Sequence, residues 1–140
     1  MKVVADTNTL VSGLLWQGAP RKLLLAAEAG RIELITSIEL RRELEGVLRR
    51  QKFGKRIRAQ RVNLNQLLAD LDARLTVIVC PPLKTPVCRD RDDDWALAAA
   101  LSAAADVIVT GDDDLLTLKS FEHIPIVTAR GFLEMISRSP

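Results

Sequence analysis

The sequence alternates short apolar runs of strand length with longer helical segments along its whole length. Strands that are apolar on both faces and separated by helices are typical of a parallel sheet covered on both sides. The pattern therefore predicts an α/β fold in which a helical hairpin, about 37–75, is inserted between the second and third strands. The expected strands are 3–5, 32–36, 76–79, 107–109 and 125–127. The expected helices are 19–29, 38–50, 57–75, 95–104 and 128–136, with a short helical turn at 115–116.

The composition fits one domain over residues 1–140 and excludes several classes of site. A hydrophobic content of 48% in 140 residues is enough for a single core. His123 is the only histidine, so a zinc site built on paired histidines is excluded. Cys80 and Cys88 are expected to be reduced thiols in a cytoplasmic protein. No apolar run approaches the roughly 18 residues of a membrane span, so no membrane partner is expected.

Acidic residues stand where the carboxyl ends of the expected strands meet. Asp6 ends the first strand, and Asp112 follows the fourth. Asp94 opens the helix that leads to the fourth strand, and Glu43 lies in the second turn of the helix after the second strand. Ligands of open parallel sheets bind at these carboxyl ends, at a switch in strand order. If strands one and four are neighbours, four carboxylates converge at one edge of the sheet.

Converging carboxylates favour a hard metal ion. Like charges held together raise each other's pKa values at a cost in stability, which a cation offsets. Oxygen ligands without histidine or cysteine favour Mg²⁺ or Mn²⁺, and such ions support phosphodiester hydrolysis by activating water. The alternative for each acid is ordinary structure, because Asp92, Asp93, Asp94 and Asp112 can cap helices and Glu43 can be a solvated surface residue.

Taken together, these motifs resemble the PIN domain family, the nuclease fold of VapC-type toxins. The resemblance implies a three-layer α/β/α sandwich whose parallel sheet of about five strands has the order 3-2-1-4-5. It implies a Mg²⁺- or Mn²⁺-dependent ribonuclease similar to the toxins of toxin–antitoxin pairs, with RNA as substrate, a small antitoxin as a possible partner and a homodimer as the assembly. The matching segments are Val3-Val4-Ala5-Asp6-Thr7-Asn8, Glu43-Leu44, Asp94-Trp95-Ala96-Leu97-Ala98 and Thr110-Gly111-Asp112.

The resemblance also assigns roles to single residues. Asn8 and Thr110 are expected to orient the metal ligands. The expected catalytic acids are Asp6, Glu43, Asp94 and Asp112. The expected metal ligands are Asp6, Asp94 and Asp112.

Two of these assignments have competitors close by in the sequence. The third ligand can be Asp94, Asp93 or Asp92, because the three are consecutive, although the spacing from Asp94 to the Thr-Gly-Asp segment fits the family best. Glu39 competes with Glu43, which better matches the Glu-Leu pair of the family helix.

A basic stretch between residues 49 and 61, which no acid interrupts, predicts an RNA-binding surface. The alternatives are a solvated helical elbow and a docking surface for an acidic antitoxin segment. Trp16 and Trp95 can stack bases, but packing is the expected role of both. The basic residues are Arg49, Arg50, Lys52, Lys55, Arg56, Arg58 and Arg61.

Two other function classes need an aspartate at a position where this sequence has none. A haloacid-dehalogenase-type phosphatase needs an aspartate where Asn8 stands, and a receiver domain needs one after the third strand, which ends in Val79-Cys80. Both are rejected. The remaining competitors are a catalytically inactive PIN-fold scaffold that binds RNA or protein, and an RNA processing or decay nuclease with no antitoxin. A metal-dependent cleavage assay separates the scaffold from the enzymes.

Overall fold

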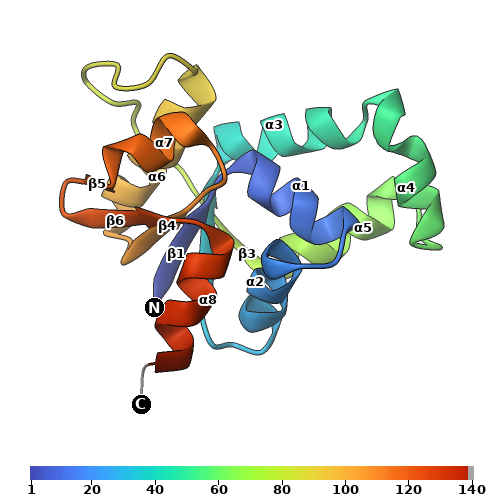
Figure 1. The fold of residues 1–140 in the computed structure, drawn as a ribbon. Helices are drawn as coiled ribbons and strands as arrows, with labels where there is room; N and C mark the ends of the chain where they lie inside the picture. Colours follow the sequence, from blue (N-terminus) through green and yellow to red (C-terminus); the bar gives the residue numbers. More distant parts are fainter. Residues whose placement is uncertain (139–140) are drawn as a thin grey trace.

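A central sheet of six strands organises residues 1–138, which the computed structural model describes (Figure 1). Its order is β3-β2-β1-β4-β6-β5, and all neighbours are parallel except β5 and β6. The five expected strands form in the expected order, with β6 as the fifth, and the two-residue antiparallel β5 is an addition. The strands are β1 (Lys2–Ala5), β2 (Glu33–Ser37), β3 (Leu75–Ile78), β4 (Val107–Val109), β5 (Ser120–Phe121) and β6 (Ile124–Val127).

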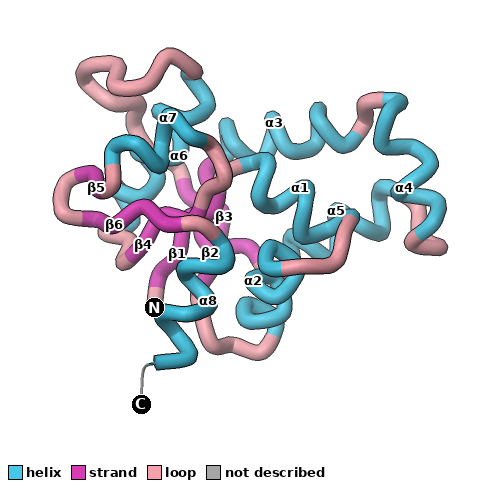
Figure 2. Tube along the Cα trace, viewed as in Figure 1, coloured by secondary structure: helices cyan, strands magenta, loops and turns pink. Residues whose placement is uncertain are grey.

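Helices cover both faces of this sheet (Figure 2). Among residues 1–138, no helix is both long and apolar enough to cross a membrane. The helices are α1 (Thr7–Leu15), α2 (Ala19–Glu28), α3 (Ile38–Leu48), η1 (Gln51–Phe53), α4 (Gly54–Ala59), α5 (Leu64–Asp72), α6 (Arg91–Ala103), α7 (Asp113–Leu118) and α8 (Ala129–Arg138).

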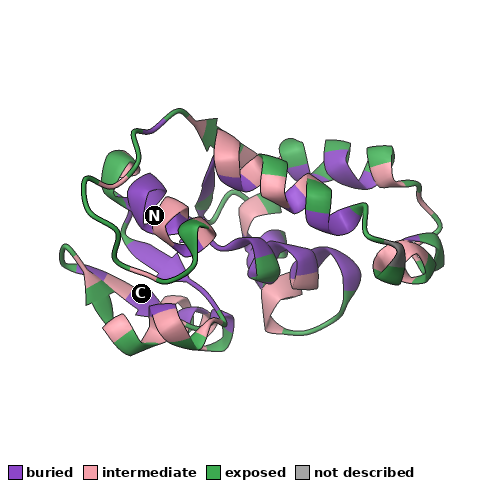
Figure 3. Ribbon diagram, turned by 90° about the horizontal axis from the view of Figure 1, so that it is seen from above, coloured by how far each residue is buried: buried purple, intermediate pink, exposed green. Residues whose placement is uncertain are grey.

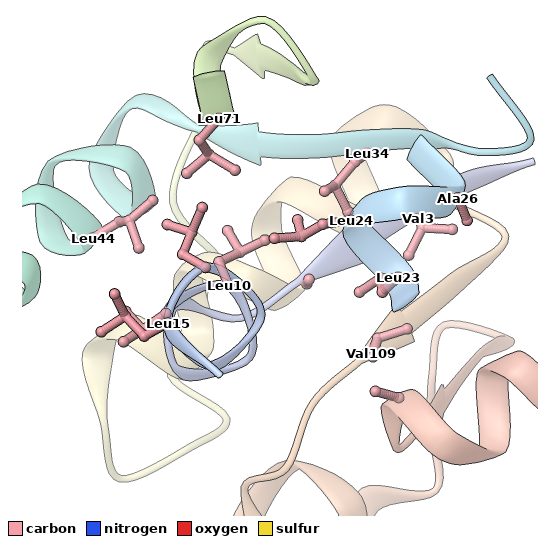
Figure 4. Close-up of a cluster of buried hydrophobic side chains, with 14 of the residues drawn as sticks. Val3, Leu10, Leu15, Leu23, Leu24, Ala26, Leu34, Leu44, Leu71 and Val109 are labelled. Atoms are coloured by element: carbon pink, nitrogen blue, oxygen red, sulfur yellow. The ribbon is translucent and has the colours of Figure 1, made fainter. Parts of the chain in front are cut away.

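Two apolar clusters on opposite faces of the sheet hold the layers together. Side chains alternate along a strand, so Val3 of β1 joins the cluster under α1, α2, α5 and α8, and Val4 joins the one under α6 and α7. Figure 3 shows the buried residues on the strands and on the inner sides of the helices. Figure 4 shows side chains of α1, α2 and α3 gathered against β1 and β2. The predicted three-layer α/β/α sandwich is confirmed.

Helix α1 is not among the helices that the sequence pattern predicts. Thr7 and Asn8 begin this helix, and Asp6 caps it. The Asp6 carboxylate accepts a hydrogen bond from the Thr9 backbone nitrogen at 3.0 Å, which satisfies one of the free N–H groups of the first turn. The helix buries Leu10 and Leu14 on its inner side, at helical spacing.

The expected long helix 57–75 is wrong, because the chain breaks into α4 and α5. Arg61 takes a positive φ of 59°, a conformation that ends a helix rather than continuing it. Asn63 and Gln66 then form a reciprocal capping box that starts α5. Helix α6 also begins four residues before the expected Trp95, because Asp90 caps it.

Candidate active site

Asp6 is fixed where strands β1 and β4 end side by side. Ala5 and Val109 are register partners, and the side chain of Asp6, only 6% exposed, follows directly. Its Oδ1 accepts from the Thr9 backbone nitrogen, and its Oδ2 accepts from the Thr110 hydroxyl at 2.5 Å. Thr110 therefore lies where an orienting residue is expected, with its hydroxyl bonded to the expected ligand.

Asp112 caps α7 at the same edge of the sheet. Its Oδ1 accepts from the backbone nitrogens of Asp114 at 2.8 Å and Leu115 at 3.3 Å. Its own backbone nitrogen donates to the Thr110 hydroxyl at 3.0 Å. Thr110 thus links the carboxylate of Asp6 to the backbone of Asp112.

The three consecutive aspartates of α6 point in different directions, because neighbouring residues of a helix lie about 100° apart. Asp94 accepts from the backbone nitrogens of Val87 and Cys88, the latter at 2.8 Å, and so holds the preceding loop. Asp93 is 8% exposed, and its buried Oδ2 has no hydrogen-bond partner among the described residues. The structure therefore does not bring Asp94 together with the other carboxylates of the site. Asp93, another of the three candidates for the third ligand, lies among them instead.

Carboxylate oxygens of three residues gather within 4.8 Å of one another: Asp93, Asp112 and Asp114. Asp114 was not singled out as a ligand, although it stands two residues after Asp112 in an acidic run. The side chain of Asp114 is 42% exposed and pairs with Arg89 at 3.1 Å. This acidic cluster is the place among the described residues where a metal ion fits best by donor type.

The electrostatics of the acidic cluster favour a cation. Burial and, to a smaller extent, the negative charges of Asp112, Asp90 and Asp6 together raise the pKa of Asp93 to about 7. A bound cation removes this penalty by giving the carboxylates an opposite charge.

Glu43 of α3 lies close to Asp92 and Asp90, at the start of α6. The Thr7 hydroxyl donates to its Oε2 at 2.9 Å, which ties α3 to the first turn of α1. Burial, opposed by the bond from Thr7 and reinforced by Asp92 and Asp90, brings the pKa of Glu43 to about 7. Glu39 instead lies near Cys80, whose pKa its charge raises along with burial. Glu43, and not Glu39, therefore faces the aspartates of α6.

Asn8 lies on the rim of the site, where its side chain is exposed. The structure gives it no hydrogen bond to Asp6, so the expected orienting contact is not formed. Asn8 lines a polar pocket of about 570 Å³ together with Ser12, Asp112 and Arg130. This pocket adjoins the acidic cluster through Asp112.

The basic residues of 49–61 lie on η1, α4 and the flanking turns, at the end of the molecule away from α6 and α7 (Figure 1). Six of the seven are exposed, and Arg56 is half-buried. Arg49, Arg50 and Arg58 line a pocket of about 660 Å³ between α3, α4 and α5. The structure thus separates the basic surface from the acidic cluster.

Two other expectations concern side chains near the site. Trp95 packs, half-buried, against the apolar cluster under α6, as expected. Both cysteines are free thiols. Burial and the neighbouring Asp94 raise the pKa of Cys88 to about 12, which excludes a thiolate nucleophile at neutral pH.

Comparisons with known proteins agree with this arrangement. The pattern of the PIN domain family matches residues 2–114, a span that contains all the carboxylates described above. An uncharacterized protein of Methanocaldococcus jannaschii is 31% identical over 145 aligned residues, which cover 96% of this chain and 90% of that protein. No solved structure gives a significant match.

Proposed function

This chain belongs to the PIN domain family, and on that premise we propose that it is a metal-dependent ribonuclease. PIN domains are generally nucleases. The observation that carries the proposal is the buried Oδ2 of Asp93, which has no hydrogen-bond partner among the described residues although the residue belongs to a group of carboxylates. An unsatisfied buried polar group costs free energy, and a divalent cation is the ligand that offsets this cost among acids.

The residues that would hold the ion are Asp93, Asp112 and Asp114. Asp6 is near enough for its charge to act on Asp93. Asp6 accepts one hydrogen bond on each carboxylate oxygen, which leaves a lone pair on each. Asp112 accepts both of its bonds on Oδ1, so its Oδ2 is available to a metal. When bound, Mg²⁺ or Mn²⁺ would supply Lewis-acid chemistry that lowers the pKa of water and stabilises the leaving oxygen of a phosphodiester.

The surrounding residues position these acids and exchange protons. Thr9 and Thr110 hold the carboxylate of Asp6 in one orientation. Thr7 donates to Oε2 of Glu43 and so fixes this carboxyl group beside Asp92. A pKa of about 7 suits a group that transfers protons near neutral pH.

The more specific proposal is the toxin of a toxin–antitoxin pair that acts on RNA. The pocket lined by Arg49, Arg50 and Arg58 has the charge to hold an acidic antitoxin segment. A homodimer and a cytoplasmic location, where the two free cysteines stay reduced, belong to the same proposal. A neighbouring reading frame for a small protein that inhibits cleavage would support it, and cleavage without any such inhibitor would favour a processing or decay nuclease.

Incubation of the purified protein with a mixed RNA pool, in Mn²⁺ or in EDTA, tests the proposed activity. The Asp6→Asn variant is the control, because asparagine keeps the shape of the side chain and can still accept the Thr9 hydrogen bond. We expect the wild type to cleave RNA in Mn²⁺ but not in EDTA, and the variant to cleave in neither. Sequencing of the RNA ends locates the cut. Binding of RNA without cleavage in any divalent metal would instead identify a scaffold.

A further inference from the structure

Trp16 is an exposed aromatic residue at the C-terminal end of α1. It is 43% exposed, although tryptophan is a large apolar side chain. The Phe53 ring meets it edge-on with ring centres 6.1 Å apart, and the Arg56 guanidinium lies over it at 5.7 Å from the ring centre. The packing expected for Trp16 is therefore partial: its ring is held in place by two neighbours, and much of its surface stays open.

The segment that holds Trp16 is fastened to α1. Arg56 donates its Nε–H, and Gln60 its side-chain amide at 3.2 Å, to the backbone oxygen of Leu15. The carbonyls of a last helical turn lack partners within the helix, and a cation is favoured at that end. Helix α4 is thereby fixed against the end of α1, and Trp16 has a set position relative to the acidic cluster.

Helix α1 connects the acidic cluster to Trp16 along one side. Asp6 caps its first turn, and Asn8 and Ser12 line the polar pocket that Asp112 shares. Trp16 ends the helix four residues after Ser12, and its backbone nitrogen donates to the Ser12 backbone oxygen at 3.0 Å. At 1.5 Å per residue, the nine residues of α1 span about 14 Å, or roughly four phosphates of a stacked strand at ~3.4 Å each.

The surroundings of Trp16 are cationic. Lys52 lies over the Phe53 ring at 5.0 Å from its centre, and Lys55 and Arg58 are exposed on the same short segment. No acid occurs between residues 49 and 61. An exposed aromatic ring among cations that track a backbone is the arrangement by which proteins bind single-stranded nucleic acid.

We propose that Trp16 stacks an unpaired base of a single-stranded RNA that runs along α1, from the acidic cluster to the basic segment of η1 and α4. This deepens the proposed function, because the acidic cluster sets where the strand is cut. The stacking contact itself needs neither metal nor cleavage, so it can be measured separately.

Binding of a labelled oligouridylate in EDTA tests the stacking contact. We expect Trp16→Ala to weaken the affinity by about 5- to 150-fold, the range of one base–aromatic contact, and Trp16→Phe to retain most of it. Leu25→Ala is the matched control, because Leu25 is a similarly exposed apolar residue on α2. The salt dependence separates stacking from charge: Trp16→Ala should leave the slope of log affinity against log salt unchanged, and Arg58→Gln should reduce it by about 0.7.

A spectroscopic measurement keeps the test independent of any folding defect in the alanine variant. In a Trp95→Phe background, Trp16 is the remaining tryptophan, and RNA should quench its fluorescence.

A series of substrates, each with one abasic nucleotide at a different position, locates the stacked base. In Mn²⁺, binding should be weakest when the abasic nucleotide lies about four nucleotides from the cut.

Unchanged affinity in Trp16→Ala, or unquenched fluorescence on RNA binding, would overturn the proposal. Loss of self-association or of a protein partner with intact RNA binding would overturn it too, because the surface would then be a protein interface. If RNA binding depends on Trp16 and no metal supports cleavage, the stacking contact holds and the proposed nuclease activity fails.

Discussion

Asp93 sets how the free energy of unfolding depends on pH when no metal is bound. Its pKa rises from an ordinary value near 3.8 to about 7 in the native state, because it is buried beside other acids. Between these values the native state holds a proton that the unfolded state has lost. Stability without metal therefore falls as pH rises through this window, and it stays low above pH 7.

Asp93→Asn removes one of the two acids whose pKa is raised to about 7, the other being Glu43. We therefore expect the variant to be more stable than the wild type at pH 8 in EDTA, with a smaller advantage at pH 5. Thermal unfolding at the two pH values measures this difference. Asp94→Asn is the adjacent control, because Asp94 accepts hydrogen bonds from Val87 and Cys88 and should lower stability at both pH values when changed. If Asp93→Asn is less stable than the wild type at pH 8, this account of the acidic cluster is contradicted.

Thr110 holds Asp6 through a hydroxyl that is fully buried. Thr110→Val keeps the volume and removes the donor, which leaves a buried carboxylate oxygen unsatisfied at a cost of about 1–3 kcal/mol. We expect that loss in urea unfolding together with reduced cleavage. Thr110→Ser keeps the hydroxyl and should restore most of the activity; equal activity in the valine and serine variants would show that the hydrogen bond does not position Asp6.

The direction of single carboxylates is the part of the site that could not be predicted from sequence. Asp6 and Asp112 follow from strand order, because parallel neighbours end at the same edge. The choice among the aspartates of α6 depends on where the helix starts, and Asp90 starts it earlier than the apolar pattern indicates. Asp114 joins the cluster because it lies in the first turn of α7, directly after the cap Asp112. A run of three aspartates does not reveal where that helix starts.

At the scale of elements, the close approach of α1 and α2 depends on Gly13. A Cβ there would lie 2.7 Å from the Pro20 backbone oxygen and 2.8 Å from the Leu24 side chain. We expect Gly13→Ala to destabilise the protein by about 1–3 kcal/mol, since backbone must move. Gly46→Ala, in the open on α3, should instead stabilise it by about 0.5–1 kcal/mol. Urea unfolding measures both, and a neutral Gly13→Ala would show that the two helices can separate freely.

The strands were more predictable than the helices. Short apolar runs between helical segments indicate buried parallel strands, and all five expected ones form. Helix α1 was not predicted because threonine and asparagine, which stand at positions 7 and 8, are common in turns as well as at helix starts. The buried residues Leu10 and Leu14, four positions apart, were the helical signal. The break after α4 depends on a backbone conformation at Arg61 that sequence does not reveal, whereas the capping box of α5 was a usable signal.

At the scale of the whole molecule, a metal that binds only the native acidic cluster should stabilise the entire fold. The expected gain is about 2.7 kcal/mol at a hundredfold excess over the Kd. Thermal unfolding against Mn²⁺ concentration measures it, and Asp112→Asn should reduce the gain because it removes a proposed ligand. The same rise in both proteins would place the ion elsewhere.

The central claim is that RNA is cut at the acidic cluster around Asp93, and two adjacent substitutions test it most directly. The measurement is the rate at which Asp93→Asn and Asp94→Asn cleave one labelled single-stranded RNA in Mn²⁺, at a temperature where both are folded. We expect Asp93→Asn to lose about 10²- to 10³-fold, as for loss of a group that stabilises the transition state, and Asp94→Asn to cleave at nearly the wild-type rate. Equal rates in the two variants, or the larger loss in Asp94→Asn, would contradict the account.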